Sequence, residues 1–229
     1  MSVIEFRGAQ VRKEEVMVLQ EIEQNTTRKF SHIGKVKVRT QMGYTVQKHH
    51  IIGIGLYGCN VSKIPKSIGS LLELRVLCLS HNQINFLPSS IGKLEKLERL
   101  SLSTNNLEVL PKVLGKLKSL RELIFFNNSL KSLPQSFQNL TSLEELYLDN
   151  NNFSEFPEAI TELPSLQTLH LNENPLRTLP PSIGKLPVLE SLSASHCSLE
   201  TLPEEIGNLK TLKRLSLDSN NLTALPESI

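Results

Sequence analysis

A leucine returns every 23 residues through most of this chain, and that period limits the possible folds more than any other feature. It recurs at Leu74, Leu97, Leu120, Leu143, Leu166, Leu189 and Leu212, and Ile51 extends the series one step upstream. Each unit follows the pattern LxxLxLxxNxLxxLPxxIGxLxx, which LERLSLSTNNLEVLPKVLGKLKS shows almost complete. We therefore expect eight units over residues 51–229, the last of them incomplete, in a solenoid where neighbouring units share their core.

The repeated residue types each have a structural reason. The leucines of LxLxx alternate, so they point inward from a short strand, and strands stacked about 4.8 Å apart form a parallel sheet that becomes the concave wall. Asparagine at the ninth position can donate and accept, so it is expected to serve neighbouring backbones as a buried ladder. The ladder comprises Asn82, Asn105, Asn128, Asn151, Asn174 and Asn220. Cys59 and Cys197 take this position in two units and are predicted to be structural thiols.

Proline and glycine mark the other half of each unit. Proline directs the chain into a short helical turn on the convex side, and glycine suits the end of that turn. The prolines are Pro65, Pro88, Pro111, Pro134, Pro157, Pro180, Pro203 and Pro226. The glycines are Gly69, Gly92, Gly115, Gly184 and Gly207.

This pattern resembles the leucine-rich repeat family, and the fixed period with LPxxIGxL is similar to its intracellular Ras-suppressor-type and plant intracellular Ras-group members. The resemblance covers residues 51–229 and implies an α/β horseshoe with a parallel concave sheet and short helical turns outside. It also implies a non-catalytic scaffold that acts in signalling. Its protein partner would be, for example, a small GTPase or a phosphatase.

Residues 1–50 lack the period and are expected to form an N-terminal cap of one helix and one hairpin. Apolar residues recur at helical spacing over residues 11–22, which predicts an amphipathic helix. The segment KVKVRTQMGYTVQKHH alternates Val36 and Val38, then Tyr44 and Val46, so we expect a hairpin that turns at residues 42–43. Such a cap would cover the core and the strand edge of the first repeat.

The hairpin and the following IIGIGLYG resemble the cap of plant leucine-rich-repeat receptors, but the paired cysteines of those caps are missing. This difference indicates a reducing compartment. The N-terminus becomes charged before a signal-peptide core could form, and no apolar run reaches the roughly 18 residues of a membrane span. A cytoplasmic protein is therefore expected. The formal net charge of +2 gives no electrostatic reason to expect nucleic acid as a partner.

The stretch RELIFFNN, residues 121–128, places apolar side chains on both faces of its strand. If Leu123 and Phe125 enter the core, alternation sends Ile124 and Phe126 to the concave surface. An apolar and aromatic centre with an acidic rim is typical of a protein-binding site, and the rim suggests that the partner supplies lysine or arginine. The predicted partner-binding residues are Ile124, Phe126, Tyr147, His170, Glu122, Glu145, Asp149 and Glu173. Alternatively, Ile124 and Phe126 only pack against Tyr147 and each other, or lie under a loop.

Motifs that carry chemistry are scarce. The sequence contains no GxxxxGK, HExxH or GxSxG, so we predict no catalytic, cofactor or metal site and no enzyme activity. His49 and His50 are expected to be solvated, and Cys78 with His81 lacks a third ligand or an orienting acid. Five lysines of two convex turns are expected to form a solvated face or a second contact site. They are Lys93, Lys96, Lys112, Lys116 and Lys118.

Two functions of different classes follow. The first is a non-catalytic scaffold that binds a protein on its concave face, and the alternative is the recognition domain of a larger enzyme whose catalytic part lies outside this chain. The last unit stops after LTALPESI, which would leave an uncovered solenoid end. We therefore expect that the natural chain continues, or that this end is buried against another molecule, such as a second copy packed end to end.

Overall fold

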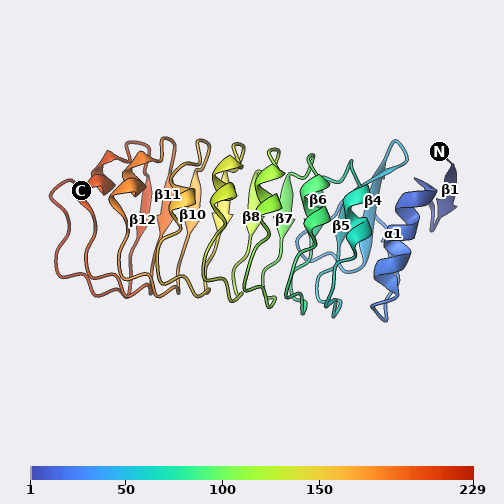
Figure 1. The fold of residues 1–229 in the computed structure, drawn as a ribbon, viewed down its shortest axis with the longest axis horizontal. Helices are drawn as coiled ribbons and strands as arrows, with labels where there is room; N and C mark the ends of the chain where they lie inside the picture. Colours follow the sequence, from blue (N-terminus) through green and yellow to red (C-terminus); the bar gives the residue numbers. More distant parts are fainter. Residues whose placement is uncertain (1) are drawn as a thin grey trace.

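The computed structural model describes residues 2–229 and contains a ten-stranded sheet that runs the length of an elongated solenoid (Figure 1). Strands of successive repeats are parallel neighbours, and residues 23 apart pair directly, as in the row Leu100, Leu123 and Leu146. The predicted solenoid with its parallel sheet is confirmed. Its repeat strands are β5 (His50–Gly55), β6 (Val76–Cys78), β7 (Arg99–Ser101), β8 (Glu122–Ile124), β9 (Glu145–Tyr147), β10 (Thr168–His170), β11 (Ser191–Ser193) and β12 (Arg214–Ser216).

The asparagine ladder joins one repeat to the next. In Asn128, Nδ2 donates to the carbonyls of Leu102 and Phe125, both at 3.0 Å, and Oδ1 accepts from the amide of Leu107 at 3.1 Å. Cys197 in the same position keeps one such bond, because its thiol donates to a carbonyl of the preceding repeat at 3.1 Å. The predicted ladder and the structural role of this cysteine are confirmed.

A 3₁₀ helix follows the proline of seven repeats and lies on the convex side. These helices are η1 (Lys66–Ser70), η2 (Ser89–Lys93), η3 (Lys112–Lys116), η4 (Gln135–Asn139), η5 (Glu158–Ile160), η6 (Pro181–Lys185) and η7 (Glu204–Asn208). The predicted glycines lie at the penultimate residue of their helices, near the end as expected, but they do not adopt the positive φ of a glycine cap. A Cβ atom on Gly115 would lie 2.1 Å from the carbonyl oxygen of Ser136, so glycine permits close packing of successive turns.

The N-terminal cap differs from the prediction at its start. An antiparallel hairpin of β1 (Val3–Phe6) and β2 (Ala9–Arg12) precedes α1 (Lys13–Glu23), which begins two residues later than expected. Arg7 and Gly8 connect the two strands with φ values of 49° and 85°, a conformation that suits a two-residue hairpin turn. Figure 1 shows α1 covering the N-terminal end of the repeats.

The second hairpin also lies later in the chain than predicted. It is formed by β4 (Gly43–Gln47) and β5, with its turn at Lys48 and His49, whose φ values are 49° and 66°. No strand forms over residues 35–42, and the remaining cap strand is β3 (Ser31–His32), parallel to β4. The expected strand at Val36 and Val38 is therefore wrong.

Residues 33–42 instead form a loop that lies on the concave side of β4 and β5. A Cβ atom on Gly55 would lie 2.5 Å from Cβ of Thr40, and one on Gly53 would lie 3.2 Å from Cγ2 of Val36. The amide of Tyr57 donates to the carbonyl of Thr40 at 2.9 Å. The glycines of β5 thus leave room for this loop over the first repeat.

Helix α1 is joined to the first repeat by a buried carboxylate. Glu15 accepts from the amide of Ile51 and contacts Nδ1 of His50, each at 2.6 Å. The prediction that both histidines are solvated is correct for the exposed His49 and wrong for His50, whose acidic partner lies 35 residues earlier in the chain.

At the other end of the described chain, β12 pairs with β11 alone, and Leu225 is 63% exposed. That another molecule covers this end stays a prediction. Within residues 2–229, the helices are too short or too polar to cross a membrane.

Candidate functional site

The sheet register brings three of the predicted residues into one row. Ile124 pairs with Tyr147, and Tyr147 pairs with His170, so these residues occupy the same position in β8, β9 and β10. Their neighbours along the strands, such as Leu123 and Phe125, belong to the continuous core. Because side chains alternate across a strand, the row faces the concave surface.

Ile124 is only 8% exposed, although it is not part of the core cluster. It therefore lies on the concave face beneath its neighbours. Phe126, two residues further along the chain, is half-buried, as are Tyr147 and His170. The accessible part of the predicted surface is thus formed by Phe126, Tyr147 and His170. We call these three residues, together with the covered Ile124, the concave ridge.

Tyr147 is held from two sides. Its ring meets the imidazole of His170 nearly edge to face, with 4.9 Å between centroids and 73° between planes. Its hydroxyl donates to Oε2 of Glu145 at 2.7 Å. Burial raises the pKa of Tyr147, and the hydrogen bond to the nearby carboxylate raises it further, so the phenol stays neutral at physiological pH.

Two of the four predicted acidic residues are the first residues of β8 and β9, and both already have partners within the chain. Glu122 forms an ion pair with Nε of Arg99, which occupies the same position in the preceding repeat. Glu145 accepts the hydroxyl of Tyr147. Our sequence interpretation placed Glu122 on the rim without this partner, although opposite charges 23 residues apart were a signal for the pair.

The other two acids lie beyond the strand ends. Asp149 accepts from the backbone amide of Asn172 at 3.1 Å and from its side-chain Nδ2 at 2.5 Å, and it lies 3.9 Å from Nδ1 of His170. Glu173 is exposed, and its carboxylate makes no hydrogen bond or ion pair within the described residues. Glu173 is therefore the member of the rim that is free to meet a partner.

Small side chains flank the ridge in the same row. Gly55, Cys78 and Ser101 precede Ile124, and serines follow His170 in the last two strands. The middle repeats are thus the ones in which large side chains fill the centre of the concave wall.

Cys78 has the features of an inert thiol. It is fully buried, and burial raises its pKa to about 11, so the reactive thiolate is not populated near neutral pH. The nearby His81 is exposed and packs against Tyr57, with ring centroids 4.6 Å apart. Among residues 2–229 we find no group of three or more histidine, cysteine or acidic side chains placed to hold a metal ion.

The family model for the leucine-rich repeat region matches residues 29–149 and 129–224. The chain therefore belongs to the leucine-rich repeat family, whose domains are generally non-catalytic interaction modules. No curated protein sequence gives a significant match.

Solved structures of similar fold include the leucine-rich repeat domain of the type III effector XopL, with 32% identity and a TM-score of 0.72. That match covers 78% of this chain and 64% of the effector domain. A leucine-rich repeat protein of Leptospira interrogans has 31% identity and a TM-score of 0.54, with 76% of this chain and 56% of that one covered. The chain thus spans less than two thirds of both.

A plant peptide hormone receptor, RGFR1 in complex with RGF2, is similar over 86% of this chain and 35% of the receptor chain, with 31% identity and a TM-score of 0.60.

Proposed function

We propose that this chain is a recognition module that binds a protein partner on its concave face, with the concave ridge at the centre of the contact. One observation carries the proposal: Tyr147 and His170 are large and partly accessible in a row whose flanking members are small, and the partly accessible Phe126 follows in the same part of the wall. Aromatic side chains at the centre of a polar surface are the usual anchors of protein interfaces.

The charges around the ridge define the chemistry of the partner. Arg99 already neutralises Glu122, whereas Glu173 is unpaired. A lysine or arginine of the partner would therefore pair with Glu173, while apolar groups of the partner contact Phe126 and Tyr147. Electrostatic pairing at the rim would orient the partner, and the aromatic side chains would provide most of the affinity.

The ridge is held rigidly before binding. Tyr147 is fixed by Glu145 and His170, and the parallel strands below are bonded repeat to repeat. A preformed surface loses little conformational entropy on association. The complex of the plant receptor RGFR1 with RGF2 supports binding of polypeptide ligands by a related fold.

We also propose that the protein acts in the cytoplasm, in signalling. The support for this location is that the three cysteines are free and buried, because thiols stay reduced in the cytoplasm and often form disulfides outside it. The resemblance to intracellular repeat proteins adds the signalling context, with a small GTPase or a phosphatase as the class of partner.

The test is affinity capture from source-cell lysate with three baits: wild type, Phe126→Asp and Leu72→Asp. Leu72 provides a control, because it is an accessible apolar side chain that follows helix η1 and belongs to no proposed contact site. We expect a specific protein captured by wild type and by Leu72→Asp to be lost with Phe126→Asp. If Phe126→Asp captures everything that wild type captures, the concave ridge is not the contact.

A further inference from the structure

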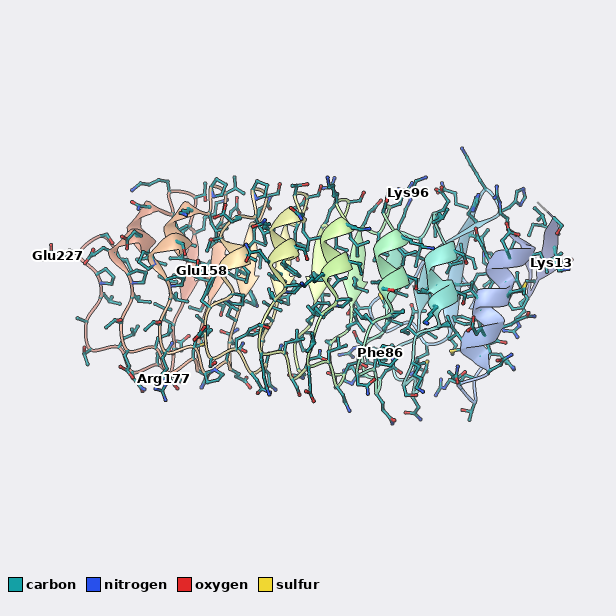
Figure 2. The ribbon with its side chains drawn as sticks, in the orientation of Figure 1. Lys13, Phe86, Lys96, Glu158, Arg177 and Glu227 are labelled. Atoms are coloured by element: carbon teal, nitrogen blue, oxygen red, sulfur yellow. The ribbon has the colours of Figure 1, made fainter. Side chains whose placement is uncertain are left out.

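A second apolar surface lies where the end of α1 meets the first two repeats. A pocket of about 450 Å³ opens there, with an apolar wall that includes Ile64, Phe86 and Leu87. Ile64 and Leu87 are buried, so they form the floor, whereas Phe86 is 47% exposed and stands at the edge. In Figure 2 Phe86 lies in the lower half of the solenoid, below the row of short helices.

Phe86 departs from the repeat pattern. It occupies the thirteenth position of its unit, where later units carry Ser132, Glu155, Thr178 and Thr201. The next unit has Val109 at this position, and that side chain is 72% exposed. No core requirement explains a large apolar residue at a position that the remaining repeats fill with polar residues or, at Ala224, a small one. These two neighbouring side chains therefore form an accessible apolar strip beside the pocket.

Positive charge borders the pocket. Lys63 and Lys66 are exposed, and their ammonium groups make no hydrogen bond or ion pair within the part of the chain that the structure describes. Glu21 also lines the pocket, where its carboxylate accepts a hydrogen bond from Ser67. The pocket therefore combines an apolar floor with two lysines and one glutamate, so its charge is net positive, and neither lysine is paired with the glutamate.

We propose that this pocket docks a short segment of a partner protein in which a bulky apolar side chain stands beside acidic ones. The apolar side chain enters between Phe86 and Leu87, and the acidic side chains pair with Lys63 and Lys66. This surface is separate from the concave ridge, so the chain has two contact sites with opposite preferences: basic partner groups at Glu173 and acidic ones here. A chain with two such sites can hold two partners, or two parts of one partner, at the same time.

A library of short random peptides displayed on phage, selected on the immobilised wild-type chain, tests the proposal. We expect the enriched peptides to carry leucine, isoleucine, phenylalanine or methionine next to aspartate or glutamate. Synthetic copies of these peptides are then titrated against purified variants by fluorescence anisotropy.

Phe86→Thr and the pair Lys63→Glu with Lys66→Glu should each weaken peptide binding by about tenfold or more, the size expected for the loss of an anchor. Threonine already occupies the same position in two other repeats, so Phe86→Thr should melt like wild type. Two controls should leave the affinity unchanged: Phe126→Asp on the ridge, and Lys112→Glu with Lys116→Glu, which makes the same charge change on another convex turn.

Three results would overturn the proposal. One is a selection that enriches no peptide, or only basic ones. Another is peptide binding that Phe86→Thr leaves intact. The third is self-association: if light scattering shows wild-type dimers that Phe86→Thr disperses, the pocket is a contact between copies of this chain.

Discussion

The phenol ring of Tyr147 and the imidazole of His170 meet nearly edge to face, with their centroids 4.9 Å apart. The two residues are 23 positions apart and pair across β9 and β10, so the repeat register brings them together. The buried leucines set that register, while the rings themselves lie on the opposite face of the sheet. Changes to the ridge should therefore affect mainly partner binding, whereas changes to the core should affect mainly the free energy of unfolding.

The double variant Phe126→Asp with Tyr147→Ala should keep its fold. Removing Tyr147 loses the ring contact with His170, which is worth about 0.5–1.5 kcal/mol, and changing the partly exposed Phe126 should add ~0.5 kcal/mol. Urea unfolding, monitored by circular dichroism, measures the resulting loss in the free energy of unfolding. Leu146→Ala, next to Tyr147 but fully buried, should instead cost about 2–5 kcal/mol through the cavity it leaves. If the double variant unfolds at the midpoint of Leu146→Ala, our assignment of the two faces is wrong.

Asn151→Ala should destabilise the solenoid by about 1–3 kcal/mol, because it leaves buried backbone groups without partners. The Asn151 side chain accepts from the amide of Leu130 and donates to the carbonyls of Phe125 and Leu148, each at 3.0 Å. Asn152→Ala is the matched control, since that side chain is exposed, makes no hydrogen bond within residues 2–229 and has no positive φ, and it should change stability by less than about 0.5 kcal/mol.

Asn151→Cys should lie between wild type and Asn151→Ala. A thiol can restore one hydrogen bond to a carbonyl, as Cys197 does at 3.1 Å. Equal midpoints for the cysteine and alanine variants in thermal unfolding would contradict the structural role assigned to the thiol.

The thiols should resist labelling in the native protein. Cys59, Cys78 and Cys197 are buried, and burial raises the pKa of each, that of Cys78 to about 11. At pH 8 a disulfide reagent such as Ellman's should react slowly with native protein and rapidly in guanidinium. Because the unfolded thiol loses its proton at lower pH than the folded one, stability should also fall as pH rises from about 9 towards 11. Rapid labelling of a native cysteine would contradict this prediction.

Glu23→Gln should weaken the N-terminal cap. The Glu23 carboxylate is buried and accepts from the amide of Phe30 at 2.7 Å and from both terminal nitrogens of Arg7. Replacement should cost about 1–3 kcal/mol, since glutamine offers Arg7 one neutral acceptor oxygen in place of a carboxylate that accepts two charge-assisted bonds. Glu5→Gln on the preceding hairpin, exposed and without such bonds, is the control.

The same carboxylate predicts acid sensitivity. Burial acts to raise the pKa of Glu23, but the hydrogen bonds from Arg7 and Phe30 and the charge of Lys29 outweigh it, so the pKa is lowered. A lowered folded pKa contributes stability above the ordinary value of 4.5, and this contribution is lost as pH falls through the folded pKa. Acid unfolding of wild type should therefore be steeper than that of Glu23→Gln, and equal slopes would contradict the assignment.

The repeats could be predicted from the sequence because each position recurs in a fixed environment. Leu123 and Phe125 were assigned to the core, and Ile124 and Phe126 to the other face, from alternation within one strand and a period repeated eight times. Accessibility was harder to predict, because it depends on neighbouring side chains in three dimensions. Ile124 is covered for that reason, although its face was correct.

The cap lacks such repetition, and there the local alternation predicted a strand that does not form. Val36 and Val38 alternate like a strand, but Val36 packs over Gly53 of β5 instead of pairing with a neighbouring strand. The partner of His50 could not be predicted either, because Glu15 becomes its neighbour only when α1 docks on the first repeat. Long-range contacts of this kind leave no periodic signal.

Photocrosslinking tests the central claim most directly. A photoreactive benzoylphenylalanine placed at residue 126 should form a covalent adduct with the captured partner, whereas the same group at Ser132, an exposed position on the flank, should form none. Mass spectrometry of the adduct should find the crosslinked peptide of the partner to contain lysine or arginine close to an apolar residue. An adduct at residue 132 but not at residue 126 would show that the partner does not bind the concave ridge.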